Sequence, residues 1–286
     1  MRRFRLIEPG SLDEASRVLA ADEEARVIAG GTALLVMMKL GVYIPSTLVN
    51  LLKLEGLREV SYGPHGLRIG ALASIHDVER HPAVREHYPI LASACHVVAN
   101  IRIRNLATMG GNIAHADYQS DPPTVLLALD ARLELDGLAG SRDIALDDFL
   151  ISSYETAIQP GEILTAIRIP PPPPDAVGRY LKFTTRSSED RPSVGVAVLT
   201  RSANGTVGEL RLVVGAVSSR PVRVREAETQ AQGERAGVDL INAVARTAAK
   251  AVDPIADLRG SVDYKRRLTE VLTRRLLTEC LEGVVQ

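Results

Sequence analysis

The sequence is poor in cysteine and in aromatic residues. Among its 286 residues it has two cysteines, Cys95 and Cys280, three phenylalanines and no tryptophan. Two thiols can build neither a disulfide framework nor an iron–sulfur cluster, which needs about four protein ligands. The scarcity of aromatic side chains also argues against a platform on which nucleic-acid bases stack. The small number of cysteines therefore predicts a protein of the reducing cytoplasm that binds no iron–sulfur cluster itself.

Long apolar runs and charge of one sign are also missing. No window approaches about eighteen consecutive apolar residues, so the sequence predicts no membrane span. The formal net charge is −1, without a long run of Lys or Arg, which argues against a nucleic-acid or membrane-surface protein. With 45% hydrophobic and 24% charged residues, the chain is expected to be globular, with two or three folding units.

The first 56 residues carry the pattern of a small α/β unit. Ser11 and Glu14 form a capping box, in which Ser11 accepts from the Glu14 amide and Glu14 reaches back. Thr32, after a Gly-Gly pair, is the expected N-cap of a second helix. Helices and strands alternate here, which favours parallel pairing of the strands. The predicted elements are helices over residues 12–21 and 33–40 and strands over residues 26–29 and 47–51.

Residues 57–172 predict a second lobe built on a mixed sheet. The turn 63–66, Gly-Pro-His-Gly, joins two short apolar runs in a predicted hairpin. Five consecutive prolines at 170–174 favour polyproline II, so we expect a stiff linker and a domain boundary there. The other predicted elements are strands over residues 57–60, 67–69, 132–136 and 163–169 and helices over residues 82–99 and 125–129.

Residues 178–286 predict a C-terminal domain. Asn204-Gly205 between two apolar runs is a strong hairpin signal. Strands are expected over residues 180–185, 194–200 and 210–217, and helices over residues 238–252 and 264–281. The fold class is therefore α+β. A two-lobed domain, with a small parallel α/β lobe (1–56) and a mixed-sheet lobe (57–172), precedes a three-stranded antiparallel sheet with helices (178–286).

The first candidate site is the segment Ala29-Gly30-Gly31-Thr32-Ala33-Leu34, between a predicted strand and a predicted helix. Glycine has no Cβ, so backbone amides can approach a ligand closely, and the N–H groups at the start of a helix suit a phosphate. The segment matches neither the dinucleotide motif G-x-G-x-x-G nor a P-loop. A tight turn that needs a positive φ is the alternative, and for this motif alone the commoner one.

The second candidate site is Thr108-Met109-Gly110-Gly111-Asn112, with Asp121 nine residues further on. A diphosphate requires amide and hydroxyl donors, and a ribose diol requires a carboxylate acceptor. Two Gly-Gly segments and such a carboxylate in one chain are what the two ends of a dinucleotide need. Together the two segments favour dinucleotide binding over a pair of structural turns.

These motifs, with Ser120-Asp121 and Gly161-Glu-Ile-Leu164, resemble the FAD-binding medium subunits of molybdenum hydroxylases, a family that includes carbon monoxide dehydrogenase and the flavin domain of xanthine dehydrogenase. The resemblance covers essentially the whole chain in motif order and spacing. Ala33 and Asn50 depart from it, since the family usually has acidic residues there. It implies FAD as the cofactor, with residues 29–34 and 108–112 at the diphosphate, Asp121 at the ribose of the adenosine half, Leu164 beside the adenine or flavin, and Lys182 near the isoalloxazine.

The same resemblance implies partners and a role. A large subunit would carry the molybdopterin cofactor and a small subunit two [2Fe–2S] clusters, in a dimer of heterotrimers. This chain would pass electrons from a cluster through FAD to NAD, a quinone or oxygen. Such a transfer needs no general acid or base, so we predict no catalytic residue and no metal ligand in the chain. Two alternatives stay open, a self-sufficient FAD-dependent oxidase and a nucleotide-binding module without redox turnover.

A charged segment, from Lys182 through Arg186 to Asp190, allows two interpretations. It is either a solvated strand end and turn, which is the usual meaning of a charge cluster, or a source of positive charge beside the N1–C2 edge of the flavin. Such a charge would stabilise the reduced flavin. The family resemblance favours the second interpretation for Lys182 and leaves the first for Arg186.

Overall fold

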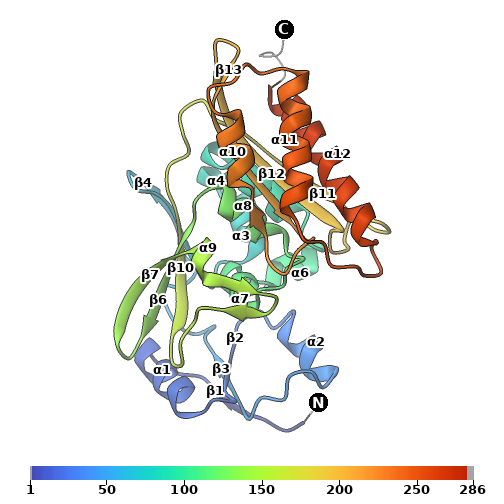
Figure 1. Ribbon diagram of the computed structural model, residues 1–286. Helices are drawn as coiled ribbons and strands as arrows, with labels where there is room; N and C mark the ends of the chain where they lie inside the picture. The colour runs from blue at the N-terminus through green and yellow to red at the C-terminus, as the bar shows by residue number, and fades with distance from the viewer. Residues whose placement is uncertain (1, 282–286) are drawn as a thin grey trace.

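The computed structural model describes residues 2–281, and a small unit that we call lobe 1 forms one end of the molecule (Figure 1). Its sheet has the order β1-β3-β2, and both strand pairings are parallel, which confirms the prediction. The elements of lobe 1 are β1 (Arg5–Ile7), α1 (Leu12–Ala21), β2 (Arg26–Ile28), α2 (Leu34–Lys39) and β3 (Thr47–Asn50).

The two predicted helix starts of lobe 1 differ from the structure in detail. Ser11 accepts from the Glu14 amide at 3.2 Å, as the capping box requires, but the Glu14 carboxylate accepts from the amide of Gly10, at 2.7 Å. The prediction of Thr32 as the N-cap of α2 is wrong. The chain turns at Gly31, whose φ is +69°, so that helical geometry begins only at Leu34 and the N-cap falls on Ala33.

Lobe 2, which follows, has a five-stranded sheet in the order β4-β5-β10-β6-β7. The sheet was expected to be mixed, but its pairings are antiparallel throughout: β4–β5 and β6–β7 are hairpins, and β10 inserts between β5 and β6, antiparallel to both. Its elements are β4 (Val60–Gly63), β5 (Gly66–Gly70), α3 (Ile75–Arg80), α4 (Pro82–His87), α5 (Pro89–His96), α6 (Ile101–Leu106), α7 (Met109–His115), α8 (Asp121–Ala128), β6 (Arg132–Gly137), β7 (Gly140–Ala145), α9 (Leu146–Phe149), β8 (Leu150–Ser152), β9 (Glu155–Thr156) and β10 (Ile163–Ile169).

Two predicted elements of lobe 2 have other bounds. The single helix predicted over residues 82–99 is two helices, α4 and α5, because Pro89 has no N–H to continue α4 and instead occupies the first turn of α5. The first strand of the hairpin begins at Val60 and not at Leu57. The Leu57 side chain is 5% exposed and packs with Ala15 and Val49 in the hydrophobic cluster of lobe 1.

The C-terminal domain has four strands in the order β11-β12-β13-β14, one more than predicted. The extra strand, β14, is only two residues long and leaves no periodic signal in the sequence. The predicted long helices are confirmed, and no helix within residues 2–281 has the length and apolar character needed to cross a membrane. The elements are β11 (Val177–Phe183), β12 (Val194–Ala203), β13 (Thr206–Gly215), β14 (Val222–Arg223), α10 (Arg225–Ala231), α11 (Val238–Ala251) and α12 (Val262–Leu281).

Both faces of the C-terminal sheet are covered (Figure 1). Helices α10 and α12 pack on one face, and α5 and α8 of lobe 2 pack on the other. Alternate residues of β12 therefore enter different cores: Val196 and Val198 join the C-terminal core, whereas Ala197 and Leu199 join the core of lobe 2. The C-terminal domain and lobe 2 thus share a hydrophobic core, which holds β11 beside α8.

Candidate functional site

The first glycine segment leaves β2 and enters α2 with its backbone donors open. Gly31 has the left-handed φ of +69° that the tight-turn interpretation requires. Within the described chain, no protein acceptor is bonded to the backbone N–H groups of residues 30–34. Successive amides that point away from the protein around a left-handed residue make a concavity that suits an anion. The turn and the ligand-binding interpretation are therefore compatible.

The second glycine segment is a helix start and not a loop. Thr108 is the N-cap of α7, and its hydroxyl accepts from the Gly111 amide at 3.1 Å. The other three amides are also bonded within the protein, those of Met109 and Gly110 to carbonyl groups of residues 73 and 71 and that of Asn112 to Thr108. The Met109 side chain is fully buried in the core. This segment therefore offers a ligand its exposed Gly111 surface and the Asn112 side chain, rather than backbone amides.

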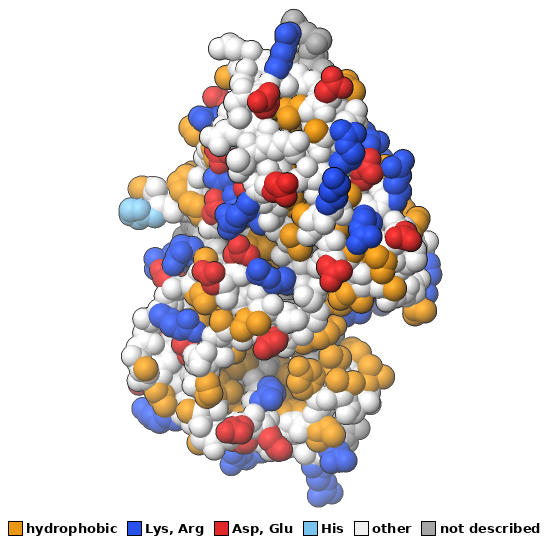
Figure 2. Space-filling view, viewed as in Figure 1, with side chains coloured by type: hydrophobic (Ala, Val, Ile, Leu, Met, Phe, Trp, Pro, Cys, Tyr) orange, Lys and Arg blue, Asp and Glu red, His pale blue; other side chains and the backbone are white. Residues whose placement is uncertain are grey.

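The two segments, whose Gly-Gly pairs are 80 residues apart in sequence, meet where lobe 1 joins lobe 2. A Cβ on Gly30 would lie 1.8 Å from the carbonyl oxygen of Leu106 and 3.1 Å from the Cα of Ala107. Only a glycine permits this approach, and Thr108 follows directly. Figure 2 shows the surface hollowed between lobe 1 and the rest of the molecule, beside hydrophobic side chains gathered over α2. The open amides of the first segment thus lie next to the start of α7.

Asp121 lies at the first turn of α8 and is engaged by two residues of β11. The Tyr180 hydroxyl donates to Asp121 Oδ1 at 2.7 Å, and the Lys182 ammonium donates to Oδ2 at 3.1 Å and to the Val97 carbonyl at 2.8 Å. The Asp121 and Lys182 side chains are each 5% exposed. An extended FAD cannot place both its adenosine ribose and its isoalloxazine at one ion pair. The ion pair therefore brings Asp121 and Lys182 to one part of an extended FAD, and which part it is stays a prediction.

The protonation of this cluster follows from its burial. Loss of solvation raises the pKa of Asp121 to about 6, although the Lys182 charge and the Tyr180 hydrogen bond act in the opposite direction. The pKa of Tyr180 is raised well above 10, first by burial and then by the neighbouring Asp121 charge. Tyr180 is therefore a donor at every physiological pH, and Asp121 is mostly ionised near pH 7.

A hydrogen bond links Asp121 to the second glycine segment. The Ser120 hydroxyl donates to Asn112 Oδ1 at 2.7 Å, and Ser120 is the N-cap of α8. This bond fixes the Asn112 side chain with its amide NH2 group left as a donor. The described geometry therefore connects the start of α7, the start of α8 and strand β11 in one polar chain.

The remaining predicted residues lie apart from this cluster. Leu164 is 6% exposed on β10 and forms part of the lobe 2 core, paired across the sheet with Leu135. Arg186 is exposed and pairs with Asp190 at 3.3 Å, which fits the solvated turn expected for it. Lys182 is buried, so the solvated interpretation is wrong for that residue.

Sequence reasoning missed Tyr180, although its signal is present. Tyr180 and Lys182 are two residues apart, and side chains at that spacing leave the same face of a strand. A strand was predicted here, so the pair of hydrogen-bond donors could have been noticed. Their shared acceptor could not, because Asp121 is 59 residues earlier in the chain.

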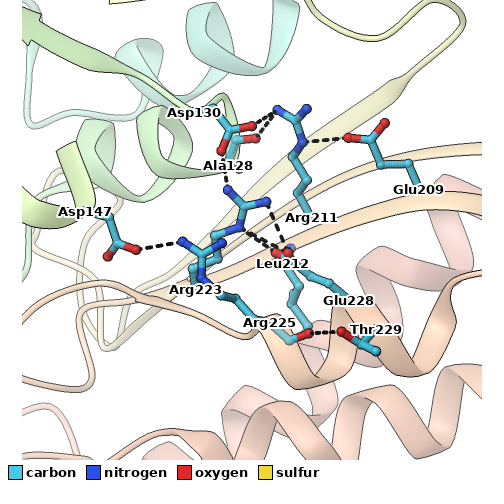
Figure 3. A network of polar contacts seen from close by, with 10 residues as sticks. All are labelled: Ala128, Asp130, Asp147, Glu209, Arg211, Leu212, Arg223, Arg225, Glu228 and Thr229. Carbon is cyan, nitrogen blue, oxygen red and sulfur yellow. Dashed lines mark hydrogen bonds and ion pairs between the residues drawn. The ribbon is translucent and has the colours of Figure 1, made fainter. Parts of the chain in front are cut away.

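An ion-pair network holds the C-terminal domain on lobe 2 (Figure 3). Asp130, just after α8, pairs with Arg211 of β13 at 2.7 Å and with Arg223 of β14. Asp147 of α9 pairs with Arg225 at 3.0 Å. These contacts join β13, β14 and α10 to lobe 2. At the other edge of the same sheet, β11 supplies Tyr180 and Lys182 to Asp121 of lobe 2.

Comparison with known proteins defines the class to which this arrangement belongs. Residues 2–172 match the family described as FAD binding domain in molybdopterin dehydrogenase, and residues 179–280 match the CO dehydrogenase flavoprotein C-terminal domain. The chain belongs to the FAD-binding subunits of molybdopterin dehydrogenases, as its motifs predict. It is thus an FAD-dependent oxidoreductase subunit, and open amides suited to a diphosphate fit that cofactor.

Individual relatives match over nearly the whole chain. The nicotine 6-hydroxylase medium subunit of Paenarthrobacter nicotinovorans is 32% identical over 96% of both chains. The glyceraldehyde dehydrogenase medium chain of Sulfolobus acidocaldarius is 31% identical over 96% of this chain and 98% of its own. A solved chain of carbon monoxide dehydrogenase from Hydrogenophaga pseudoflava superposes with a TM-score of 0.95 at 31% identity, with 98% of each chain covered. The predicted α+β architecture is thereby confirmed.

Proposed function

We propose that this chain is the flavoprotein subunit of a molybdenum hydroxylase, which passes electrons from partner iron–sulfur clusters through FAD to an external acceptor. The acceptor would be NAD, a quinone or oxygen. The partners would be a molybdopterin-binding large subunit and a [2Fe–2S] small subunit, assembled as a dimer of heterotrimers. Similar proteins are named medium subunits or medium chains of dehydrogenases and hydroxylases, which supports a multi-subunit assembly.

The observation that carries the proposal is the meeting of the two glycine segments. Because Gly30 packs against Leu106, a ligand bound by the open amides of residues 30–34 would also lie close to the start of α7. FAD, when bound, supplies the group that takes up and releases electrons. The chain's own residues bind the diphosphate, exclude water from the cluster of Asp121 and hold the Lys182 charge in place. We propose that FAD contacts the chain directly at residues 29–34, 108–112, 164 and 182.

We also propose the position of Asp121 and the domain division. The Lys182 charge is expected beside the isoalloxazine. Because Asp121 forms an ion pair with Lys182, we place Asp121 on the isoalloxazine side as well. Three hydrophobic clusters support a division into three units, for which we propose residues 1–56, 57–172 and 178–286. The cluster of lobe 1 also includes Leu57, Leu72 and Ile163 of lobe 2. Two buried free thiols suit a reducing cytoplasm.

An apolar surface on lobe 1 supports the existence of a partner. Exposed hydrophobic side chains gather on and after α2 (Figure 2). They are Val36, Leu40, Val42 and Ile44, which are between 45% and 72% exposed. Exposed apolar clusters of this kind on soluble proteins commonly mark interaction surfaces. The isolated chain therefore has a surface that an assembly would cover.

Anaerobic reduction of the chain, alone and with partners, tests the function. The isolated chain should bind FAD and be bleached by dithionite, yet stay oxidised with any hydroxylation substrate, because two cysteines cannot build the donor cluster. Co-expression with a molybdopterin-type subunit and a cysteine-rich subunit should restore reduction by substrate. Rapid reduction of the isolated chain by substrate would support the oxidase alternative. A colourless chain would support a nucleotide-binding module.

A further inference from the structure

The carboxylate of Asp121 receives one donor on each oxygen, and the donor that had no predicted role is Tyr180. Its hydroxyl lies 2.7 Å from Oδ1, closer than the 3.1 Å between the Lys182 ammonium and Oδ2. Lys182 has a second acceptor, the Val97 carbonyl, whereas Tyr180 has Asp121 as its side-chain partner. The orientation of the carboxylate is therefore set from both sides.

The sheet is built to admit this hydroxyl. Gly195 of β12 pairs with Lys182 across the sheet, and a Cβ on Gly195 would lie 2.7 Å from the Tyr180 hydroxyl oxygen. Any larger residue would push the hydroxyl away from Asp121. The hydrogen bond from the Tyr180 hydroxyl to Asp121 thus depends on the absence of a side chain at Gly195.

The chemistry of the contact favours an ionised carboxylate. A donor to a charged oxygen stabilises the charged form of the acid, and the effect is strong where solvent is excluded. The charged groups that act on Asp121 are Lys182, which favours ionisation, and the more weakly felt Asp117, which opposes it. Without Tyr180, one oxygen of the buried carboxylate would lose its donor.

We infer that Tyr180 is a positioning residue, which holds Asp121 as the ionised partner of Lys182 and so fixes the Lys182 ammonium at the FAD site. This inference rests on the proposed function and adds a residue to it. Tyr180 acts through Asp121 and need not touch the cofactor. Its effect should therefore depend on the protonation of Asp121 and disappear when that carboxylate is removed.

The test is the FAD dissociation constant of the full chain from about pH 5.5 to 8.5, measured by quenching of flavin fluorescence. Tyr180→Phe should weaken FAD binding about tenfold near pH 7, the loss typical of a hydrogen bond to a charged group. Loss of the donor raises the pKa of Asp121, so the fall in affinity on acidification should begin at a higher pH than in the wild type. Tyr62→Phe, the same change on the exposed ring of β4, should leave the curve unchanged.

A double-mutant cycle separates positioning from general damage. In an Asp121→Asn background, Tyr180→Phe should cost much less affinity than in the wild type, because the ionisable acceptor is gone. Gly195→Ala keeps the phenol but displaces it, and should reproduce the shift in the pH curve if Tyr180→Phe does not fold. Folding of each variant is checked by thermal unfolding.

Two results would overturn the inference while the proposed function stands. One is a Tyr180→Phe curve that superposes on that of the wild type. The other is an equal loss at every pH that adds fully to that of Asp121→Asn, since a merely structural role predicts this. A wild-type chain that binds no FAD would overturn both the inference and the proposed function.

Discussion

The two glycine segments are alike in sequence and opposite in structure. Residues 30–34 leave their backbone N–H groups without protein acceptors, whereas the four amides of residues 109–112 are all bonded within the protein. Each pair also contains one glycine that packing requires. A Cβ on Gly30 would strike Leu106, and a Cβ on Gly110 would lie 2.5 Å from the Cβ of Ala71.

The difference shows that a Gly-Gly pair has several physical causes. In the first segment Gly31 supplies a left-handed turn that exposes donors, and in the second Gly110 lets α7 pack against the loop after β5. Of the four glycines in the two pairs, Gly111 alone has neither a positive φ nor a backbone neighbour that excludes a side chain. The first segment therefore meets α6 through the packing of Gly30, and the second is tied through Asn112 and Ser120 to the buried ion pair of Asp121.

The largest expected effect comes from breaking that ion pair, on which only the second segment depends. Lys182→Ala would leave the Asp121 carboxylate buried without its counter-charge, and we expect a loss of about 3–5 kcal/mol in the free energy of unfolding near pH 8. Without Lys182 the pKa of Asp121 rises above about 6. A folded-state pKa above the unfolded value stabilises the protein at low pH, so the deficit should shrink as the pH falls toward 5. Urea unfolding at several pH values measures it.

The matched control is Arg186→Ala, four residues further along, which removes the exposed pair with Asp190. Its cost should stay within about 0.5 kcal/mol. In the FAD-loaded chain, Lys182→Ala should also lower the flavin midpoint potential by some tens of millivolts near pH 8. Near pH 5 Asp121, whose pKa is about 6 in the wild type, is mostly protonated in both chains, so the difference of one positive charge remains and the potential should stay below that of the wild type. Equal effects of the two substitutions would show that the buried pair has no special role.

A second, smaller effect tests the contact between the segments. Gly30→Ala would place a Cβ 1.8 Å from the Leu106 carbonyl oxygen, and the backbone must move to accept it. We expect a loss of about 3 kcal/mol in the free energy of unfolding, together with loss of FAD binding. Gly63→Ala, where nothing lies within 4 Å of the added Cβ, is the control and should be nearly neutral. A Gly30→Ala chain as stable as this control would refute the packing of lobe 1 against α6.

The regular elements of the fold were predictable from the sequence where the periodicity was long. Helices α1, α11 and α12 and strands β10 and β12 lie within a few residues of their predicted bounds. The six- and seven-residue helices α3, α6 and α7 were missed, because tertiary contacts rather than local periodicity decide such short elements. The break at Pro89 was visible in the sequence, but the apolar face that continues past it favoured one helix.

The candidate site was predictable as a set of residues and not as a geometry. Both glycine pairs, Asp121 and Lys182 stand out in the sequence, and the family match agrees with the cofactor they indicate. That Asp121 touches Lys182 could not be predicted, because 61 residues and a domain junction separate them. The amides of Met109 and Gly110 are not open to a ligand, because they donate to the carbonyl groups of residues 73 and 71. These acceptors are distant in sequence, so no local pattern predicts them.

The smallest expected change in stability distinguishes the two segments most sharply. Gly111 is exposed at the third position of α7, and the nearest atom to an added Cβ is the Thr108 hydroxyl oxygen, at 2.7 Å. Capped helices ordinarily carry a side chain at this position, and alanine favours the helix over glycine by up to about 1 kcal/mol. Gly111→Ala should therefore unfold within about 1 kcal/mol of the wild type. If FAD lies against the bare Cα, the added methyl group should still weaken its binding at least about tenfold, as measured by fluorescence titration. The control is Gly41→Ala, which has a positive φ in open space and should lose a little stability but no affinity. Unchanged FAD affinity in Gly111→Ala would remove the second segment from the binding surface and leave the open amides of residues 30–34 as the only diphosphate contact among the two glycine segments.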